Sequence, residues 1–250
     1  MTEVRSSREM PVPAAIPILL SFVAGYVDSY TYLALFGLFV AQVTSSFVLA
    51  GAELVTHNYG IAGKLLALVT FIVAAAVTAG LVGLAREKGR AALPLMLMLE
   101  AALLIAFVAL ILFGPALTGA ADWHGIVAGL FAAMAMGAQS VLVRLLMKGI
   151  PQTNVMTGNM TQLGIAMTDL ILAWRRLRHS GHTRADLREF AEIRRQLLTV
   201  LFIALGFLVG AAAGALAFAV TGLRGALLAV AIVCALALWA LARERGARSP

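Results

Sequence analysis

Long apolar blocks alternate with short polar segments along the whole chain. Six of these blocks carry few polar residues, and they cover about residues 14–35, 61–85, 93–113, 124–147, 197–220 and 225–243. A helix of about 20 residues, rising ~1.5 Å per residue, crosses a hydrocarbon core of roughly 30 Å. The pattern therefore predicts six transmembrane helices in an all-α integral membrane protein.

The composition strengthens this prediction. Hydrophobic residues make up 62% of the 250 residues and charged residues 12%, whereas about a quarter of the residues in a typical soluble domain are charged. A soluble chain of this length could not bury so much apolar surface in one core. We therefore expect the lipid bilayer to be the main partner of the chain.

Two further blocks, at about 36–56 and 149–173, are apolar but contain polar residues near their starts. Basic residues gather at 86–90, at 174–196 and in the C-terminal tail, and such segments normally face the cytoplasm. If all eight blocks crossed, the basic segments at 86–90 and 174–196 would lie on opposite sides, whereas all three basic segments and both termini share one side if both odd blocks enter and leave the membrane on the same side. We therefore predict two re-entrant half-helices, with broken full spans as the alternative. The expected location is the bacterial inner membrane, with both termini cytoplasmic.

This topology divides the chain into five parts, taken from the positions of the spans and of the basic segments. They are a cytoplasmic tail at 1–13, a first half at 14–113, an outer linker at 114–123, a second half at 124–243 that includes a basic cytoplasmic loop at 174–196, and a cytoplasmic tail at 244–250. Within this loop, apolar residues at helical spacing predict an amphipathic surface helix over residues 184–196.

The two odd blocks also align with one another. A shift of 113 residues places residues 40–46 on residues 153–159 and Gly51 on Gly164, and Gly25 falls within one residue of Gly137. Each half contains three full spans, so the second half enters the membrane in the opposite sense. The pattern predicts an inverted repeat, which is common in transporters.

The aligned polar segments are the predicted solute site. Thr44 and Thr157, or the residues that follow them, suit the N-cap of a half-helix, and a helix N-terminus near the midplane attracts anions and polar solutes. Small polar residues that only pack helices closely are the structural alternative. The predicted substrate-binding residues are Gln42, Thr44, Ser45, Ser46, Asn154, Thr157, Gly158, Asn159, Asp28 and Gln139.

Charged groups are costly inside a span, and three of those within the predicted spans bear on function. Asp28 is interpreted either as a site of proton or cation coupling or as a carboxylate satisfied by nearby Ser29 or Tyr30. Glu100 and Arg144 lie at similar depths from the same side, so we expect them to pair, either structurally or as a gate.

Other classes of function find little support in the sequence. The net charge of +7 flanks apolar blocks rather than forming a nucleic-acid motif. The four histidines and the single cysteine, Cys234, show no metal-ligand spacing, and no catalytic or phosphate-loop pattern is present. We expect no enzyme activity, no metal, no cofactor and no nucleic-acid partner. A homodimer is possible for a chain with only six spans.

The residues that carry these features resemble the YoaK-like family of bacterial membrane proteins. The resemblance extends over roughly residues 14–243 and includes the segments at 25–28, 39–44, 137–140 and 151–164. It implies a small multi-span protein of a functionally uncharacterised family. The first polar segment departs from the family, which has Asn and Thr-Gly-Asn where this chain has Gln42 and residues 44–46.

We therefore expect a secondary transporter or channel-like facilitator for a small polar or anionic solute. The alternative is a membrane scaffold or regulatory protein that transports nothing. The scaffold predicts that side chains pack the half-helix termini, whereas the transporter predicts a polar cavity between them.

Overall fold

The structure is a computed structural model that describes residues 13–56, 60–179 and 183–248. Within these residues the chain is entirely helical and contains no strand. The helices are α1 (Ala15–Ala34), α2 (Ser45–Thr56), α3 (Ile61–Glu87), α4 (Ala92–Phe113), α5 (Trp123–Leu146), α6 (Met156–His179), α7 (Arg184–Thr221), the 3₁₀ turn η1 (Gly222–Ala226) and α8 (Leu227–Arg248).

Several of these helices are long and apolar enough to cross a membrane. They are Ala15–Ala34, Ile61–Glu87, Ala92–Phe113, Trp123–Leu146 and a stretch at Arg184–Gly246 that includes both α7 and α8. This finding fits a multi-pass membrane protein, as the apolar blocks predicted. The count of six crossings with two re-entrant segments stays a prediction.

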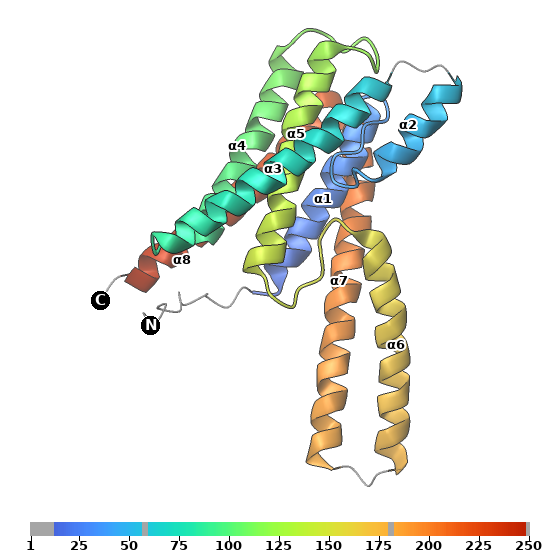
Figure 1. Cartoon of the computed structure of the whole chain (residues 1–250), viewed down its shortest axis with the longest axis vertical. Coiled ribbons are helices and arrows are strands. Elements are labelled where there is room, and N and C mark those ends of the chain that lie inside the picture. The colour runs from blue at the N-terminus through green and yellow to red at the C-terminus, as the bar shows by residue number, and fades with distance from the viewer. Residues whose placement is uncertain (1–12, 57–59, 180–182, 249–250) are drawn as a thin grey trace.

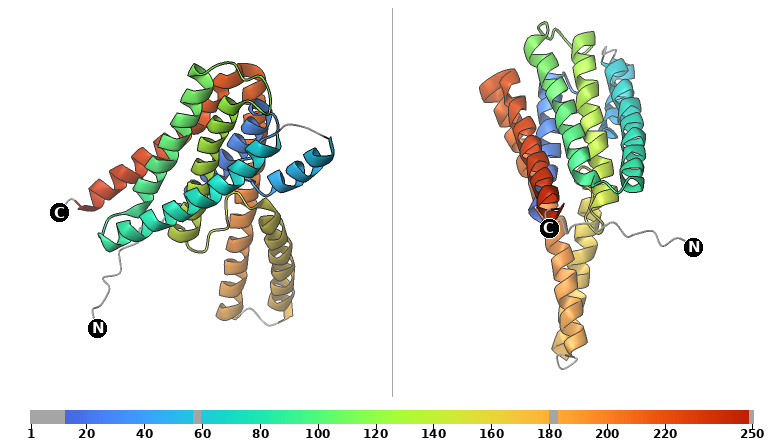
Figure 2. Two further views of the ribbon diagram at one scale, coloured as in Figure 1. Left: turned by 45° about the horizontal axis from the view of Figure 1, so that its top comes forward. Right: turned by 90° about the vertical axis from the view of Figure 1, so that its left-hand side faces the viewer.

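The bundle contains α1, α3, α4, α5 and α8, and α7 runs through it and beyond (Figure 1). The first half of α7 leaves the bundle alongside α6 as an antiparallel hairpin, which projects in every view (Figure 2). The sequence predicted a loop over 174–196 with an amphipathic helix at 184–196. The helix is confirmed, but it is the beginning of α7 rather than a separate element, and residues 174–179 belong to the end of α6. The Thr183 side chain caps α7 by accepting a hydrogen bond from the Asp186 N–H at 3.2 Å, so the basic residues extend the two helices.

Both odd blocks break as their polar starts predicted. Residues 35–44 are not helical and lead into the 12-residue helix α2, and residues 147–155 are not helical and lead into α6. Phe36 and Gly37, with φ values of 55° and 90°, reverse the chain after α1, and a positive φ ends a right-handed helix. The second half-helix was predicted to be short, but α6 has 24 residues.

Glycine lets α1 and α7 approach backbone to backbone. A methyl group on Gly25, Gly210 or Gly214 would overlap a carbonyl oxygen of the facing helix, at Phe207, Phe22 or Tyr26 respectively. Gly206, Gly210 and Gly214 follow the four-residue spacing that brings membrane helices into close contact. This contact fixes α1, which carries Asp28, against the second half of the chain.

Matching contacts occur in the two halves. The Ser46 hydroxyl donates to the Phe39 carbonyl at 3.4 Å, and the Asn159 amide donates to the Gln152 carbonyl at 2.7 Å. Both pairs span seven residues, and they differ by the 113-residue shift found in the sequence. Each polar segment is therefore folded back on the start of its helix in the same way.

Helices of one half also pack on helices of the other half. Gly25 of α1 lies against Phe207 and Ala211 of α7, and Gly137 of α5 lies against Phe71 and Ala75 of α3. The first helix of each half thus packs on the third helix of the other half. This pairing brings the two broken segments, which follow α1 and α5, into the middle of the molecule.

Candidate functional site

A cavity of about 400 Å³ lies between the two broken segments. Thr44 and Thr157 lie on its boundary, at the starts of α2 and α6, and α3 and α5 complete its walls. The residues that line it are Ala41, Gln42, Val43, Thr44, Phe71, Ala75, Ser140, Val141, Arg144, Gln152, Asn154, Val155, Met156 and Thr157. The sequence pointed to this place, because the predicted cavity lies between the same two threonines.

Asp28 holds the first broken segment. Its Oδ1 accepts hydrogen bonds from the backbone N–H groups of Val40 and Ala41, both at 2.8 Å, and its Oδ2 accepts one from Gln42 at 3.2 Å. The side chain lies in α1 and is 3% exposed. Backbone N–H groups that leave a helix inside a membrane must find an acceptor within the protein, and this carboxylate supplies one for three consecutive residues.

This arrangement corrects one detail of the interpretation of Asp28. The carboxylate is satisfied within the protein, but by a loop 12 to 14 residues further along the chain rather than by Ser29 or Tyr30. Its position behind the cavity wall gives it a positioning role, since the residues that it holds include Ala41 and Gln42, which line the cavity.

The second broken segment is held by α1 and α5. The Ser21 hydroxyl lies 3.0 Å from the Thr153 carbonyl oxygen and 2.8 Å from that of Ile203. The Gln139 amide nitrogen donates to the Leu20 carbonyl and to the Thr153 hydroxyl, each at 2.9 Å. Gln139 is therefore one layer behind the cavity, where it fixes the loop that supplies part of the lining.

Asn154 joins the two segments directly. Its amide nitrogen donates to the Ser140 hydroxyl at 2.6 Å and to the Ala41 carbonyl at 3.3 Å. Ala41 and Asn154 are 113 residues apart, which is the shift that aligns the two odd blocks in the sequence. Their hydrogen bond ties the two broken segments together beside the cavity, since both residues line it.

The starts of α2 and α6 differ chemically. The N–H groups of Ser45, Ser46 and Phe47 donate to the carbonyls three residues earlier, at 2.9, 3.1 and 3.2 Å. In α6 the first backbone bond is made by the N–H of Asn159, to the Val155 carbonyl four residues earlier at 3.2 Å. The described residues offer no acceptor to the N–H groups of residues 156–158, so only the α6 end has the free donors that attract an anion.

Arg144 brings a positive charge to the cavity. It lines the wall from α5 and is exposed, and no ion pair involving it occurs among the described residues. The predicted pair with Glu100 is wrong, because Glu100 is completely buried and neither of its oxygens has a hydrogen-bond partner in the described chain. Sequence reasoning missed that Arg144 faces the polar cavity.

The remaining predicted residues fall outside the cavity wall. Ser46 and Asn159 bond the backbone of their own segments, and Ser45 is not in the lining. Gly158 and Asn159 line a second cavity of about 610 Å³, between the loop at 148–151 and the α6–α7 hairpin. The structure therefore brings together Gln42, Thr44, Asn154 and Thr157, and it adds Ser140, Arg144 and Gln152.

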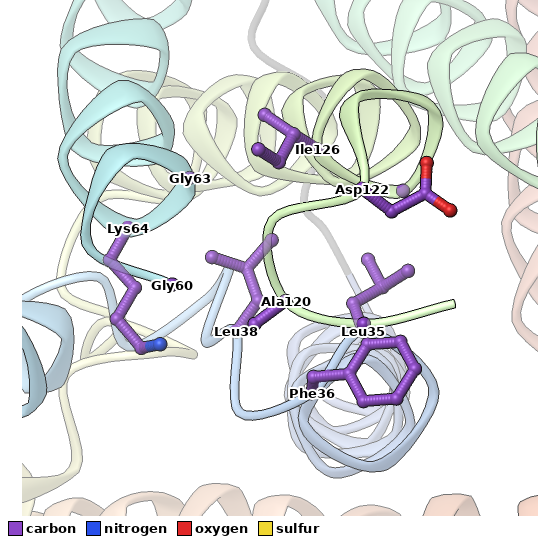
Figure 3. Close-up of a pocket in the computed structure, with 11 residues that line it drawn as sticks. Leu35, Phe36, Leu38, Gly60, Gly63, Lys64, Ala120, Asp122 and Ile126 are labelled. Atoms are coloured by element: carbon purple, nitrogen blue, oxygen red, sulfur yellow. The ribbon is translucent and has the colours of Figure 1, made fainter. Parts of the chain in front are cut away.

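At the far end of the bundle a third pocket has room for about one water molecule, with a volume of about 10 Å³. Leu35 and Leu38 fill the space between the starts of α3 and α5 there, and the Asp122 carboxylate points away from Lys64 (Figure 3). Lys64 instead forms a buried ion pair with Glu53 at 2.7 Å. This pair ties α2 to α3, and the sequence pattern gave no sign of it.

Asp122 caps α5 beside this pocket. Its carboxylate accepts hydrogen bonds from the Thr118 N–H at 3.1 Å and the His124 N–H at 2.9 Å, and these bonds lower the pKa of Asp122. Among the described residues no cluster of three or more His, Cys, Asp or Glu could hold a metal ion.

Comparison with known proteins assigns the family. No curated protein and no solved structure matches the chain significantly. A family profile described as "Protein of unknown function (DUF1275)" matches residues 16–240, which is most of the chain. The match is compatible with the YoaK-like resemblance, although it does not carry that name. The chain belongs to the DUF1275 family, whose function is unknown.

Proposed function

We propose that this protein is a membrane transporter or channel-like facilitator for a small anionic solute, which binds in the cavity between the two broken segments. The observation that carries the proposal is the cavity itself, with a volume of about 400 Å³, polar groups from both halves and an arginine in its wall. Small-molecule sites typically measure about 300–1,000 Å³, so a cavity near the low end suits a small solute.

The electrostatics of the cavity favour an anion over a neutral polar solute. Arg144 supplies a full positive charge that no carboxylate of the described residues pairs with, and the first turn of α6 supplies N–H donors without an acceptor there. Thr157 adds a hydroxyl group, and Gln42 and Gln152 add side-chain amides that can donate hydrogen bonds. We infer that Arg144 and the α6 N-terminus bind the charged group of the solute.

We further propose that the halves at 14–113 and 124–243 form an inverted repeat. Three observations support this view: the matching side-chain bonds of Ser46 and Asn159, the matching packing of Gly25 and Gly137 on the other half, and the contact between the equivalent positions Ala41 and Asn154. Inverted repeats place solute sites at the interface of their halves, where the cavity lies.

The repeat and the basic residues together suggest a topology. We propose six crossings by α1, α3, α4, α5, α7 and α8, with the α2 and α6 segments re-entrant. The turn at 86–90 and the arginines near the end of α8 would then face the cytoplasm of a bacterium, in accordance with the positive-inside rule.

A scaffold without transport predicts that side chains fill the space between the two threonines. The cavity favours transport over this alternative.

Uptake into proteoliposomes tests the proposal. The purified protein would be reconstituted and assayed with a panel of labelled anions that contains inorganic phosphate, sulfate, acetate and lactate. Arg144→Gln removes the charge and Thr157→Val removes the hydroxyl group. A hydrogen bond to a charged group contributes about 1.5–3 kcal/mol, so we expect Arg144→Gln to reduce uptake about ten-fold or more.

Two matched variants serve as controls. Arg188→Gln removes an exposed arginine of α7, and Thr168→Val removes an exposed threonine of α6 whose hydroxyl bonds only its own helix at 3.1 Å. Both should transport like the unmodified protein. If no anion of the panel enters, or if uptake is the same in Arg144→Gln and Arg188→Gln, the proposed function is wrong.

A further inference from the structure

Glu100 lies in a polar layer that divides the hydrophobic core. One apolar cluster includes Leu104 of α4 and Met136 of α5, and the other includes Leu97 of α4 and Leu142 of α5. Between these clusters the buried polar residue of α4 is Glu100, and that of α5 is Gln139. Because α4 packs along α5, the two side chains lie in the same layer of the bundle.

Three oxygen atoms in this layer have no hydrogen-bond partner among the described residues. They are both carboxyl oxygens of Glu100 and the amide oxygen of Gln139, and both residues are 0% exposed. The amide nitrogen of Gln139 already donates to Leu20 and Thr153, so only its oxygen remains free. The layer therefore contains acceptors and lacks a donor.

A proton supplies that donor. An ionised carboxylate without a partner is very costly in a protein interior, whereas a protonated carboxyl group is neutral and has an O–H to donate. A proton on Glu100 removes the charge and gives the Gln139 oxygen a donor. One bound proton therefore accounts for both the unpaired carboxyl group of Glu100 and the unpaired amide oxygen of Gln139.

We propose that Glu100 is a proton-binding site, that its protonated carboxyl group donates a hydrogen bond to the Gln139 amide oxygen, and that this proton exchanges with solution during the working cycle. The proton joins a carboxylate oxygen and leaves as H⁺, so no electron transfer is involved. This inference rests on the proposed function, and it identifies the proton as the ion coupled to anion movement.

The hydrogen bonds connect Glu100 to the cavity. Gln139 donates to the Thr153 hydroxyl at 2.9 Å, and the next residue, Asn154, lines the cavity and bonds Ala41 of the other half. When Glu100 loses its proton, the Gln139 amide loses its donor and the buried charge attracts water or a new partner. The loop at 153–154 then has to adjust, which changes the wall where the anion binds.

Other charged or titratable groups on the elements around α4 lie away from this layer, except Cys234 of α8, which packs against the first cluster next to it. Lys64 and His124 are near the Asp122 end of α3 and α5 and bond Glu53 and the Leu110 carbonyl, respectively. The others are Arg86 and Glu87 at the end of α3, Arg144 at the cavity, Arg224 in η1, and Arg243, Glu244 and Arg245 on α8. None of them is a hydrogen-bond partner of Glu100.

Infrared spectroscopy tests the proton directly and requires no solute. At neutral pH the unmodified protein should show the carbonyl stretch of a protonated carboxyl group, and this band should disappear in Glu100→Gln. The glutamine also donates to Gln139, so we expect the variant to fold. Gln139→Met should shift the band to higher frequency, because the O–H then lacks its acceptor. Glu189→Gln, which removes an exposed glutamate of α7, should leave the band unchanged.

Absence of the band from the unmodified protein, or its persistence in Glu100→Gln, would overturn the proton site. If Glu100→Gln does not fold, ¹³C-labelled glutamate in the unmodified protein decides the matter, since the band must then shift with the label.

Coupling is tested in proteoliposomes with whichever anion of the panel is taken up. A pH gradient should stimulate uptake several-fold in the unmodified protein and not in Glu100→Gln. Equal stimulation of both overturns the coupling, whereas a total lack of uptake overturns the proposed function and leaves the infrared result to decide the proton site.

Discussion

Replacing Asp28 by asparagine tests how a bilayer-spanning helix holds a non-helical segment beside it. The carboxylate accepts three backbone N–H groups, from Val40, Ala41 and Gln42. Asparagine keeps one oxygen, which can still accept from Val40 and Ala41. Its NH₂ group then faces the Gln42 N–H, so two donors meet and one backbone group loses its acceptor.

The cost follows from the number of N–H groups that lose their acceptor. A buried donor without an acceptor costs about 1–3 kcal/mol, so we expect Asp28→Asn to lower the free energy of unfolding by about 1–3 kcal/mol. The bond to Gln42 is the longest of the three, at 3.2 Å, which favours the lower part of this range. Asp28→Ala removes all three acceptors and should cost about 3–9 kcal/mol by the same reasoning.

Two measurements check this prediction. Unfolding in mixed micelles with an increasing fraction of SDS gives the change in stability, and hydrogen–deuterium exchange gives the protection of the amides at 40–42. Both variants should exchange faster there. Asp169→Asn is the control, because it makes the same chemical change at an exposed position of α6. Unchanged stability and unchanged protection in Asp28→Ala would refute the role assigned to this carboxylate.

Two further predictions concern packing and pH. Gly25→Ala should lower the melting temperature, because its methyl group would lie 2.9 Å from the Phe207 carbonyl carbon and overpacking costs about 1–3 kcal/mol. Gly80→Ala is the control, because its methyl group would meet open space, and it should leave the melting temperature unchanged. Equal melting temperatures of the two variants would contradict the backbone contact. Asp122→Asn should destabilise the protein at neutral pH. Hydrogen bonds, first of all from the Thr118 N–H, lower the pKa of Asp122 in the folded state, so its contribution is present above the unfolded pKa of about 3.9 and is lost as the pH falls through the folded value. The difference between the two proteins in a pH series of melting curves should shrink accordingly, and a constant difference would contradict this origin.

The sequence was informative where polarity interrupts an apolar pattern. Residues 40–46 and 153–159 stood out because a bilayer does not tolerate such groups without a reason, and the structure has its breaks and its cavity there. The predicted spans also agree with α1, α3, α4, α5 and α8 to within a few residues. Local polarity and block length were sufficient for these features.

The features that the sequence missed depend on contacts between distant residues. Two such features are the Lys64–Glu53 pair and the bonds of Asp28 to residues 40–42. Their partners are 11 to 14 residues apart and do not lie on one continuous helix, so helical periodicity does not indicate them. The basic segment at 174–196 was predicted as a cytoplasmic loop with an amphipathic helix at 184–196, and that helix is confirmed. The sequence did not indicate that it is continuous with the next apolar block, because the two were treated as separate elements; the Thr183 cap allows α7 to begin well before its apolar part, and arginine is a good helix former.

The two halves of the proposed repeat differ in charge at the cavity, and this difference bears on function. In the first half a carboxylate holds the loop, and the first N–H groups of α2 are already bonded. In the second half Ser140 stands near the position equivalent to Asp28, the first turn of α6 keeps free donors, and Arg144 follows one turn later on α5. An anion would therefore bind mainly to the second half, while the first half would contribute Thr44 and Gln42 to the facing wall. If that is correct, Thr157→Val should impair uptake more than Thr44→Val, although the two threonines are related by the repeat. Equal losses of uptake in the two variants would instead indicate that the anion contacts both threonines alike, and that the charge of Arg144 does not draw it toward the second half.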